Sequence, residues 1–233
     1  MDFARFDSRG YRTVDVREGY GGWAPTYEAT VPDELDLALL ERLSAVDWPQ
    51  VRRAADLGCG TGRTGSWLRA RGVASVDGVD LTAEMLAVAR SRQIYDRLLE
   101  ADVTATGLEA GAYDLVTTSL VDEHLPDLGP LYGESRRLAA PGAFHVLVGY
   151  HPHFIIASGM PTHFRSGSGE ELAIQTHVHL LSDHVGAALE AGWTLVEMRE
   201  RVIDDAWLAV KPKWERFRNQ PISVAFVWRL QQL

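Results

Sequence analysis

Cysteine is almost absent from this 233-residue chain, and it lacks both a long apolar run and a basic excess. Cys59 is the only cysteine, so no internal disulfide can form, and a reducing, cytoplasmic location is the expectation that fits. The longest apolar stretch, around residues 143–150, is too short to span a bilayer and contains His145. The first residues also lack the basic-then-apolar order of a signal peptide. We therefore expect a soluble protein outside the membrane.

The charge balance narrows the choice of partners. The formal net charge is −9, with no block of like charges. Nucleic acids and acidic membrane surfaces both attract basic proteins, so neither is an expected partner. A small-molecule partner is the expectation that remains, and the sequence leaves the oligomeric state open.

Apolar runs alternate with helical patterns between about residues 53 and 150, which predicts a parallel sheet covered on both faces. The expected strands are Ala54–Leu57, Ser75–Val79, Leu98–Val103, Tyr113–Ser119 and Phe144–Gly149. The expected helices between them are Thr64–Arg71, Ala83–Arg90 and Leu128–Leu138.

The flanking segments have other textures. Residues 1–50 contain an aromatic, glycine-rich stretch at 11–27 and an expected helix at 33–43. Residues 151–181 include a Ser166–Gly169 turn that predicts a hairpin. A helix at 183–191 and two antiparallel strands at 193–202 and 222–230 are expected to follow. The link at 204–221 is long for a loop without secondary structure, and loops of this length usually have a function.

The strongest motif is the glycine loop from Asp56 to Arg63, which reads Asp-Leu-Gly-Cys-Gly-Thr-Gly-Arg and lies between a strand and a helix. Residues 60–65 also fit the dinucleotide fingerprint, with Asp80 at about the expected distance. A carboxylate at Asp56 would repel a pyrophosphate, however, whereas it suits the ammonium and sulfonium of S-adenosylmethionine. The dinucleotide register would also start two residues late. The loop therefore favours S-adenosylmethionine over a dinucleotide.

Further motifs follow in order. They are Val79–Leu86, Ala101–Val103, Tyr113–Val116 and a segment ending in Leu125-Pro126-Asp127 after Glu123-His124. Together with the glycine loop they resemble the class I S-adenosylmethionine-dependent methyltransferases over about residues 53–150. The resemblance implies S-adenosylmethionine as cofactor and S-adenosylhomocysteine as product.

By this resemblance, Asp80 would accept hydrogen bonds from both ribose hydroxyls, and Asp102 would accept one from the adenine amino group. Each also has a simpler interpretation, as a helix cap for Asp80 and as a turn residue for Asp102. The other residues that the resemblance places at the cofactor are Asp56, Gly58, Cys59, Gly60, Gly62 and Arg63 in the loop and Leu81, Met85, Val103, Ser119 and Leu120 at strand ends. Leu81 and Met85 could instead be plain core. Cys59 is interpreted as structural filler and not as a nucleophile, because no basic partner is nearby.

An aromatic trio, Tyr20, Trp23 and Tyr27, precedes the core. In similar proteins such a segment covers the cofactor. The two tyrosines could then bind the methionine carboxylate, and Trp23 could stack on the acceptor or face the sulfonium. Ordinary packing of a lid is the alternative. The apolar side chains that could add walls for a flat acceptor are Phe154, Met160, Phe164 and Trp207.

All 8 histidines lie between His124 and His184. His124 and His151 follow strand ends where ligands of open α/β sheets bind, so they are the candidate general bases. Polar packing under a lid is the alternative for both. Two His-x-His pairs, at 151–153 and 177–179, could suit a metal, but no matching carboxylate spacing accompanies them, and we predict no metal site.

The prediction is thus an α/β fold with a doubly wound, seven-stranded, mostly parallel sheet and an antiparallel last strand. An N-terminal helical lid (1–50) would precede a methyltransferase domain (51–233) with a capping insertion at about 151–181 after the fifth strand. The predicted activity is methyl transfer to an oxygen or nitrogen of a small apolar or aromatic metabolite. The alternatives are an NAD-dependent oxidoreductase and a non-catalytic module that binds S-adenosylmethionine.

Overall fold

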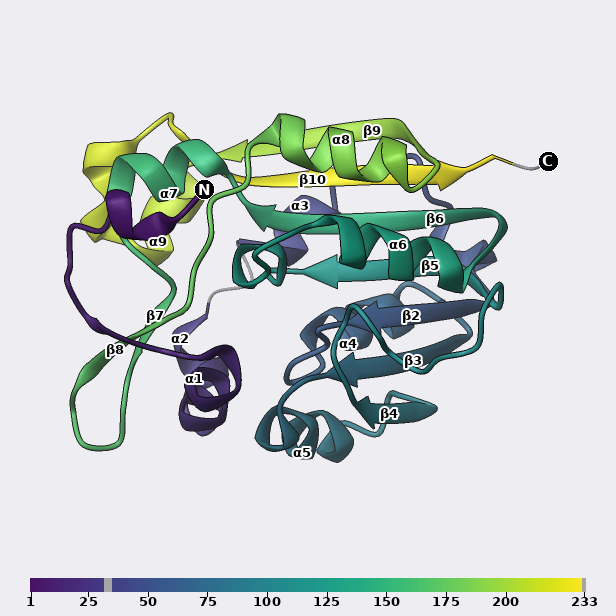
Figure 1. The fold of residues 1–233 in the computed structure, drawn as a ribbon, viewed down its shortest axis with the longest axis horizontal. Coiled ribbons are helices and arrows are strands. Elements are labelled where there is room, and N and C mark those ends of the chain that lie inside the picture. The colour runs from purple at the N-terminus through teal and green to yellow at the C-terminus, as the bar shows by residue number, and fades with distance from the viewer. Residues whose placement is uncertain (32–34, 232–233) are drawn as a thin grey trace.

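A seven-stranded sheet forms the centre of the computed structural model, which describes residues 1–31 and 35–231. Its strand order is β4-β3-β2-β5-β6-β10-β9 (Figure 1). The strands are β2 (Arg53–Leu57), β3 (Ser75–Asp80), β4 (Arg97–Glu100), β5 (Tyr113–Ser119), β6 (Ala139–Tyr150), β9 (Trp193–Val202) and β10 (Pro221–Leu230). Strand β10 is antiparallel to both of its neighbours, β6 and β9, while the remaining pairs are parallel. The predicted sheet is confirmed, including its antiparallel last strand.

Helices cover both faces of this sheet because the central strands are apolar on both sides. On one face α6 (Gly129–Leu138) and α8 (Leu181–Glu190) pack against a core that contains Leu57, Val116 and Trp228. On the other face α3 (Leu37–Leu40), the 3₁₀ turn η2 (Trp48–Gln50) and α4 (Arg63–Ala70) pack against Ala54 and Leu115. Helix α5 (Ala83–Ser91) lies beside β3 and β4. No helix in the described ranges is long and apolar enough to cross a membrane.

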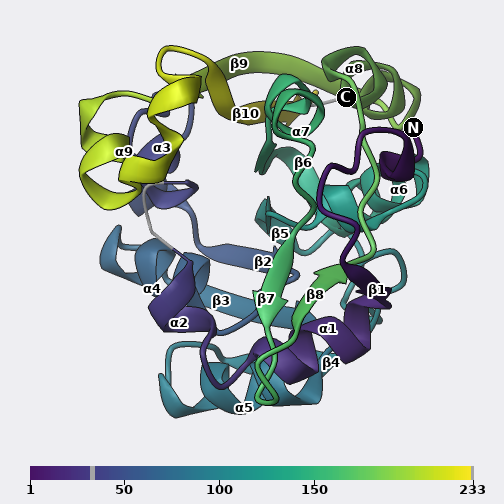
Figure 2. The same cartoon turned by 90° about the vertical axis from the view of Figure 1, so that its left-hand side faces the viewer.

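A second, three-stranded sheet lies over the carboxyl ends of the parallel strands (Figure 2). It joins β1 (Arg12–Val14) to the hairpin β7 (His163–Arg165) and β8 (Glu171–Ile174), in the order β1-β8-β7. Helices α1 (Val16–Trp23) and α2 (Tyr27–Thr30) lie beside it. The predicted hairpin is therefore present. The lid is not purely helical, because its first strand completes the sheet of the insertion.

Four local predictions need correction. Of the helix expected at 33–43, the described residues form only the single turn α3. Residues 33 and 34 of that prediction lie outside the described ranges. Strand β4 ends at Glu100, before the expected Val103, because Asp102 accepts from the Thr104 amide in a tight turn (2.8 Å). The insertion opens with an unexpected helix, α7 (Pro152–Ser158), and the 204–221 link contains α9 (Asp205–Val210) and the 3₁₀ helix η4 (Pro212–Phe217). Two other short 3₁₀ helices are η1 (Phe3–Arg5) and η3 (Asp122–His124).

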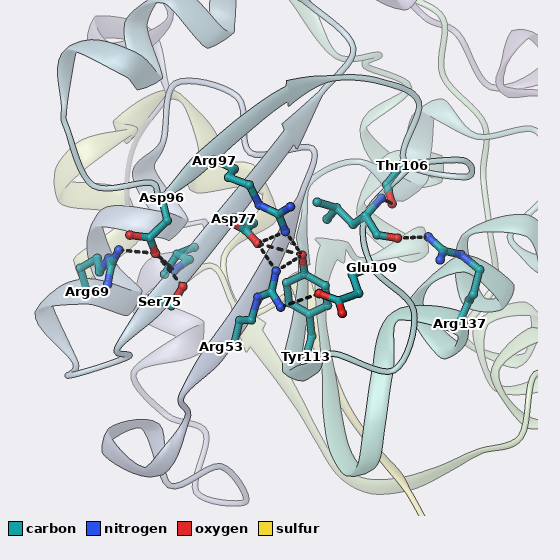
Figure 3. A network of polar contacts seen from close by, with 12 residues as sticks. Arg53, Arg69, Ser75, Asp77, Asp96, Arg97, Thr106, Glu109, Tyr113 and Arg137 are labelled. Atoms are coloured by element: carbon teal, nitrogen blue, oxygen red, sulfur yellow. Dashed lines mark hydrogen bonds and ion pairs between the residues drawn. The ribbon is translucent and has the colours of Figure 1, made fainter.

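The amino ends of the strands carry a polar network, shown in Figure 3. Asp77 on β3 is buried and accepts from Arg97 (2.7 Å), Tyr113 (2.8 Å) and Arg53 (3.2 Å). Burial alone would raise the pKa of Asp77, but these three donors lower it overall. This network joins β2, β3, β4 and β5 at the edge of the sheet opposite the small sheet.

Candidate functional site

The glycine loop follows β2 at the point where the strand order reverses between β2 and β5. Gly58, Gly60 and Gly62 all have left-handed backbones, with φ of 70°, 51° and 90°. A Cβ at Gly58 would lie 2.2 Å from Val121 Cγ2, whereas a Cβ at Gly60 would meet no atom within 4 Å. Gly58 is thus required by packing, and Gly60 leaves open space beside the loop. In open α/β sheets, ligands bind at this reversal of the strand order.

A cavity of about 240 Å³ lies beside the loop, and we call it the glycine-loop cavity. Its lining includes twelve of the eighteen sequence-predicted site residues, namely Tyr20, Tyr27, Gly58, Gly60, Asp80, Leu81, Met85, Asp102, Val103, Ser119, Leu120 and His124. Val16, Thr82, Val121, Leu125 and Pro126 complete it. Residues from five different chain segments are therefore brought together around one space.

Two carboxylates mark the polar side of the glycine-loop cavity. Asp80, at the end of β3, accepts from the Gly60 amide (2.8 Å) and the Thr82 amide (2.9 Å), which fixes its orientation against the loop. Burial raises the pKa of Asp80. Asp102 is held by the Thr104 amide and hydroxyl. Apolar side chains such as Leu81 and Met85 also line this cavity. This arrangement fits a nucleoside, with carboxylates for hydroxyl and amino groups and an apolar face for the base.

Asp56 and Cys59 lie beneath the loop and do not line the glycine-loop cavity. Asp56 is buried and accepts from Tyr95 (2.7 Å) and Thr117 (2.9 Å); burial raises its pKa to about 6. Burial also raises the pKa of the Cys59 thiol. Asp56 can therefore act on a ligand in this cavity only through the electric field of its charge and by supporting the loop. Cys59 is a buried, packed side chain.

Arg63 turns away from the glycine-loop cavity toward the N-terminal segment. Its guanidinium donates to Asp36 (2.9 Å), and the two side chains are only 9% and 6% exposed. Three further contacts join the N-terminal segment to the loop region: Arg17 pairs with Glu100 (2.6 Å), and Glu28 pairs with Arg92 (2.6 Å) and accepts from the Thr61 hydroxyl. The segment is thus fastened over the glycine loop by one buried and several exposed polar contacts.

Tyr20 and His124 form a hydrogen-bonded pair at the glycine-loop cavity. His124 Nδ1 lies 2.7 Å from the Gln175 carbonyl, which can only accept, so Nδ1 carries the ring proton. In the neutral ring Nε2 therefore accepts from the Tyr20 hydroxyl, 2.8 Å away. Burial lowers the pKa of His124 to about 4, so the ring is neutral at physiological pH. Both nitrogens are engaged, and neither is free for a ligand.

A larger cavity of about 490 Å³ is lined by residues that include Trp23 and Glu123, and we call it the aromatic cavity. Its aromatic lining consists of Trp23, Tyr150, Phe154, His163, Phe164, Trp207 and Trp214. Lys211 and Lys213 are its ammonium-bearing lining residues, and Glu123 and Glu171 are its carboxyl-bearing ones. The walls suggested by the sequence, Phe154, Met160, Phe164 and Trp207, all belong to it. A cavity of this size and character suits a flat organic molecule.

Trp23 and His151 lie elsewhere than at the glycine-loop cavity. Trp23 lines the aromatic cavity, stacked on Phe164 with ring centroids 5.8 Å apart, and its indole donates to Thr30 (2.8 Å). His151 lines neither cavity; its Nδ1 accepts from the His153 amide at the start of α7, and its Nε2 contacts Glu200 (2.9 Å). The ring of His151 is thus occupied as a helix cap. Gly62 also lies outside the cavity lining and is the N-cap residue of α4.

Glu123 lines the aromatic cavity, and the sequence analysis did not propose it as functional. It lies in η3, is 2% exposed, and accepts from the Thr162 hydroxyl through Oε1 (2.5 Å). Burial raises its pKa well above the usual range of a glutamate. The sequence places it directly before His124, but only the folded chain shows that a carboxyl group reaches the aromatic cavity. Within the described ranges, no group of three or more His, Cys, Asp or Glu side chains is arranged to hold a metal ion.

Comparisons with known proteins agree with this geometry. Residues 55–147 match the protein family described as methyltransferase domain. The chain is 34% identical over 131 residues to a malonyl-[acyl-carrier protein] O-methyltransferase from Enterobacter lignolyticus, covering 54% of this chain and 50% of that protein. It is 33% identical over 146 residues to a ubiquinone biosynthesis O-methyltransferase from Sodalis glossinidius, covering 60% and 55%. The chain thus spans about half the length of these relatives.

A solved structure shows the same fold. It is an S-adenosylmethionine-dependent methyltransferase from Mesorhizobium loti, with a TM-score of 0.64 at 22% identity, covering 83% of this chain and 96% of that one. The structural match extends beyond residues 55–147, so the fold is shared over more of the chain than the family match covers.

Proposed function

We propose that this chain is a class I S-adenosylmethionine-dependent methyltransferase and that it transfers the methyl group of that cofactor to an oxygen or nitrogen of a small apolar or aromatic molecule. The observation that carries this proposal is the pair of adjacent cavities. The glycine-loop cavity is lined by His124, and the aromatic cavity by the preceding residue, Glu123. A donor in one cavity and an acceptor in the other would meet near these two residues.

In the glycine-loop cavity, the residues supply recognition. Asp80 would accept hydrogen bonds from the ribose hydroxyls, Asp102 from the adenine amino group, and Leu81 and Met85 would pack on the base. The cofactor, when bound, supplies a methyl group on a positively charged sulfur that is already activated. The Tyr20 hydroxyl donates a hydrogen bond to His124, so the lone pairs of its oxygen remain available to a positively charged neighbour.

In the aromatic cavity, the side chains would align the acceptor and keep water away. Trp23 and Phe164 stack on each other, and Phe154 stacks on Trp214 with ring centroids 4.6 Å apart. Such walls hold a flat ring in a limited set of orientations. Since methyl transfer is an in-line displacement, alignment and exclusion of water are the main contributions that we assign to the chain.

The relatives support oxygen as one acceptor atom, because both are named as O-methyltransferases. The net charge of −9 supports a small molecule over a nucleic acid, and the single, buried cysteine fits the proposed cytoplasmic location. An NAD-dependent oxidoreductase is less favoured, because the loop register and the buried Asp56 disfavour a pyrophosphate. A module that only binds cofactor is less favoured too, because it would not need the aromatic cavity.

The test is formation of S-adenosylhomocysteine from S-adenosylmethionine by the purified chain, across a panel of phenols, catechols and aromatic amines. We expect turnover with at least one acceptor class, and a loss of turnover in the Asp80→Ala variant at low cofactor concentration. Binding of S-adenosylhomocysteine without turnover on any acceptor would favour the non-catalytic module instead.

A further inference from the structure

Glu123 and the next residue in the chain line different cavities. Glu123 lines the aromatic cavity, whereas its neighbour His124 lines the glycine-loop cavity. The insertion helps to fix the backbone of Glu123, because the backbone carbonyl of Glu123 accepts a hydrogen bond from the His177 amide (2.6 Å). The 3₁₀ turn η3 and this contact together fix the backbone of Glu123, whose side chain lines the aromatic cavity.

The two oxygens of this carboxyl group differ. Oε1 accepts from the Thr162 hydroxyl (2.5 Å) and lies 3.5 Å from His124 Nε2. For Oε2, no hydrogen-bond partner is present among the described residues, although the atom is buried. A buried polar atom without a partner costs free energy, and a ligand that donates a hydrogen bond would recover that cost. The chain thus holds an acceptor atom ready beside a cavity that suits a flat molecule.

We propose that Glu123 Oε2 receives the hydrogen bond, and then the proton, of a hydroxyl or amine on the methyl acceptor. This inference rests on the proposed function. The acceptor's oxygen or nitrogen forms the new bond to the methyl carbon, the electron pair of the broken carbon–sulfur bond stays on sulfur, and the acceptor's proton passes to Oε2. Oε1, held by Thr162, keeps the carboxyl group oriented during this transfer.

His124 is less suited to this role, although the sequence favours it. Its Nδ1 proton is donated to Gln175 and its Nε2 accepts from Tyr20, so a proton could reach it only through the tyrosine. A base works best when its pKa is close to the working pH. Burial moves the pKa of Glu123 upward from an acidic value and that of His124 downward to about 4, so burial favours Glu123.

The same geometry selects the acceptor class. A carboxylate acceptor carries no proton to donate at neutral pH and would be repelled by an ionised Glu123. An aromatic hydroxyl or amine offers both a donor for Oε2 and a ring for the walls formed by residues such as Phe164 and Trp214. We therefore expect this chain to methylate aromatic hydroxyls or amines and not carboxylates.

Several titratable groups surround Glu123 and bear on its protonation. Asp122 precedes it, and its negative charge raises the pKa of Glu123, second to burial. The other nearby groups are His124, Tyr20, Tyr27 and Tyr150. Burial raises the pKa values of all three tyrosines and lowers that of His124 to about 4, so none of these four groups carries charge at neutral pH.

The first test compares two probes that differ by one donor, 2-naphthol and its methyl ether 2-methoxynaphthalene. Each is titrated into the full chain with saturating S-adenosylhomocysteine, and quenching of tryptophan fluorescence reports binding near Trp23, Trp207 and Trp214. We expect wild type to prefer naphthol about tenfold or more, as a hydrogen bond to a charged group allows. Glu123→Leu should abolish the preference, while Glu171→Gln, a change at an ion-paired glutamate of the same cavity, should preserve it.

An equal affinity of wild type for both probes, absence of binding by either, or an unchanged preference in Glu123→Leu would each overturn the proposal. The affinity for S-adenosylhomocysteine, measured by calorimetry on the same variants, should be unchanged, because Glu123 does not line the glycine-loop cavity. If wild type fails to bind S-adenosylhomocysteine, the proposed function fails, and the probe preference separately decides the role of Glu123.

A second readout needs no ligand. Because the folded pKa of Glu123 is raised above its unfolded value, the folded state holds this proton more tightly, and stability is lost as pH rises through the folded pKa. The free energy of unfolding of wild type should therefore fall relative to Glu123→Gln between mildly acidic and alkaline pH. A difference that does not change with pH would show that Glu123 does not titrate as a buried acid and would overturn its role as base.

Discussion

The glycine-loop cavity and the aromatic cavity are neighbours, but the chain builds them in different ways. The first is formed mainly by the ends of β2, β3 and β5 and the turns that follow them, with α1 and α2 as its cover. The second is formed by Glu123 and by three segments far apart in sequence: the α1–α2 region with Leu35, residues 150–176, and the link from Trp207 to Ile222. On the proposed function, recognition of the cofactor would depend on the main sheet, and recognition of the acceptor largely on additions to it. Substitutions in one cavity should leave binding in the other intact.

Arg63 tests how the N-terminal segment, which contributes residues to both cavities, is held against the glycine loop. Arg63→Met should lower the free energy of unfolding by about 3–5 kcal/mol, because it leaves Asp36 buried without its main cation. Chemical denaturation measures this, with Arg71→Ala as a matched control, since Arg71 and Glu41 form an exposed pair worth at most about 1 kcal/mol. If Arg63→Met instead kept full stability and lost cofactor binding, Arg63 would be a cofactor ligand, as the sequence predicts.

Asp80 tests the polar side of the glycine-loop cavity. Asp80→Ala should weaken binding of S-adenosylhomocysteine by about 1–3 kcal/mol, because charge-assisted hydrogen bonds to the ribose are lost. The control is Phe164→Leu, which alters a side chain that lines the aromatic cavity but not the glycine-loop cavity and should leave this affinity as in wild type. Calorimetric titration of both variants decides between them, and equal losses would show that the cavities do not act separately.

Gly60 and Gly107 form a matched pair for the open space beside the loop. Both have positive φ, 51° and 71°, and a Cβ at either would meet no atom within 4 Å. Each alanine variant should therefore cost about 1–2 kcal/mol of stability from backbone strain alone. Affinity for S-adenosylhomocysteine should fall in Gly60→Ala only, because Gly60 lines the glycine-loop cavity and Gly107 does not. Equal affinities in the two variants would mean that the space beside Gly60 is not the cofactor's.

The sheet was predictable because its signals are local. The limits expected for β5 (Tyr113–Ser119) and β9 (Trp193–Val202) match the structure, and each strand follows a glycine-containing turn. Helix α7 was missed because Pro152 suggests a break, although proline is well tolerated in a first helical turn, and His151 caps it. The helix expected at 33–43 was predicted too long. Its apolar residues pack on the sheet, but they belong to the single helical turn α3 and to the coil that follows it.

The candidate site divides in the same way. The residues expected at the cofactor from strand ends, such as Asp80, Asp102 and Ser119, lie around one cavity because parallel strands end at one edge. The direction of a side chain cannot be read from such a pattern, so Arg63 and His151 were placed at the cleft although they bond to Asp36 and Glu200. Glu123 could not be singled out, because its burial depends on Thr162 and His177 from the distant insertion.

The most direct test of the central claim is a calorimetric titration of the wild-type chain with S-adenosylhomocysteine, with NAD titrated in parallel. The account predicts saturable one-to-one binding of S-adenosylhomocysteine and no heat of binding with NAD. Binding of NAD without binding of S-adenosylhomocysteine would contradict it, because the glycine loop would then hold a pyrophosphate despite Asp56, and the oxidoreductase alternative would replace the methyltransferase.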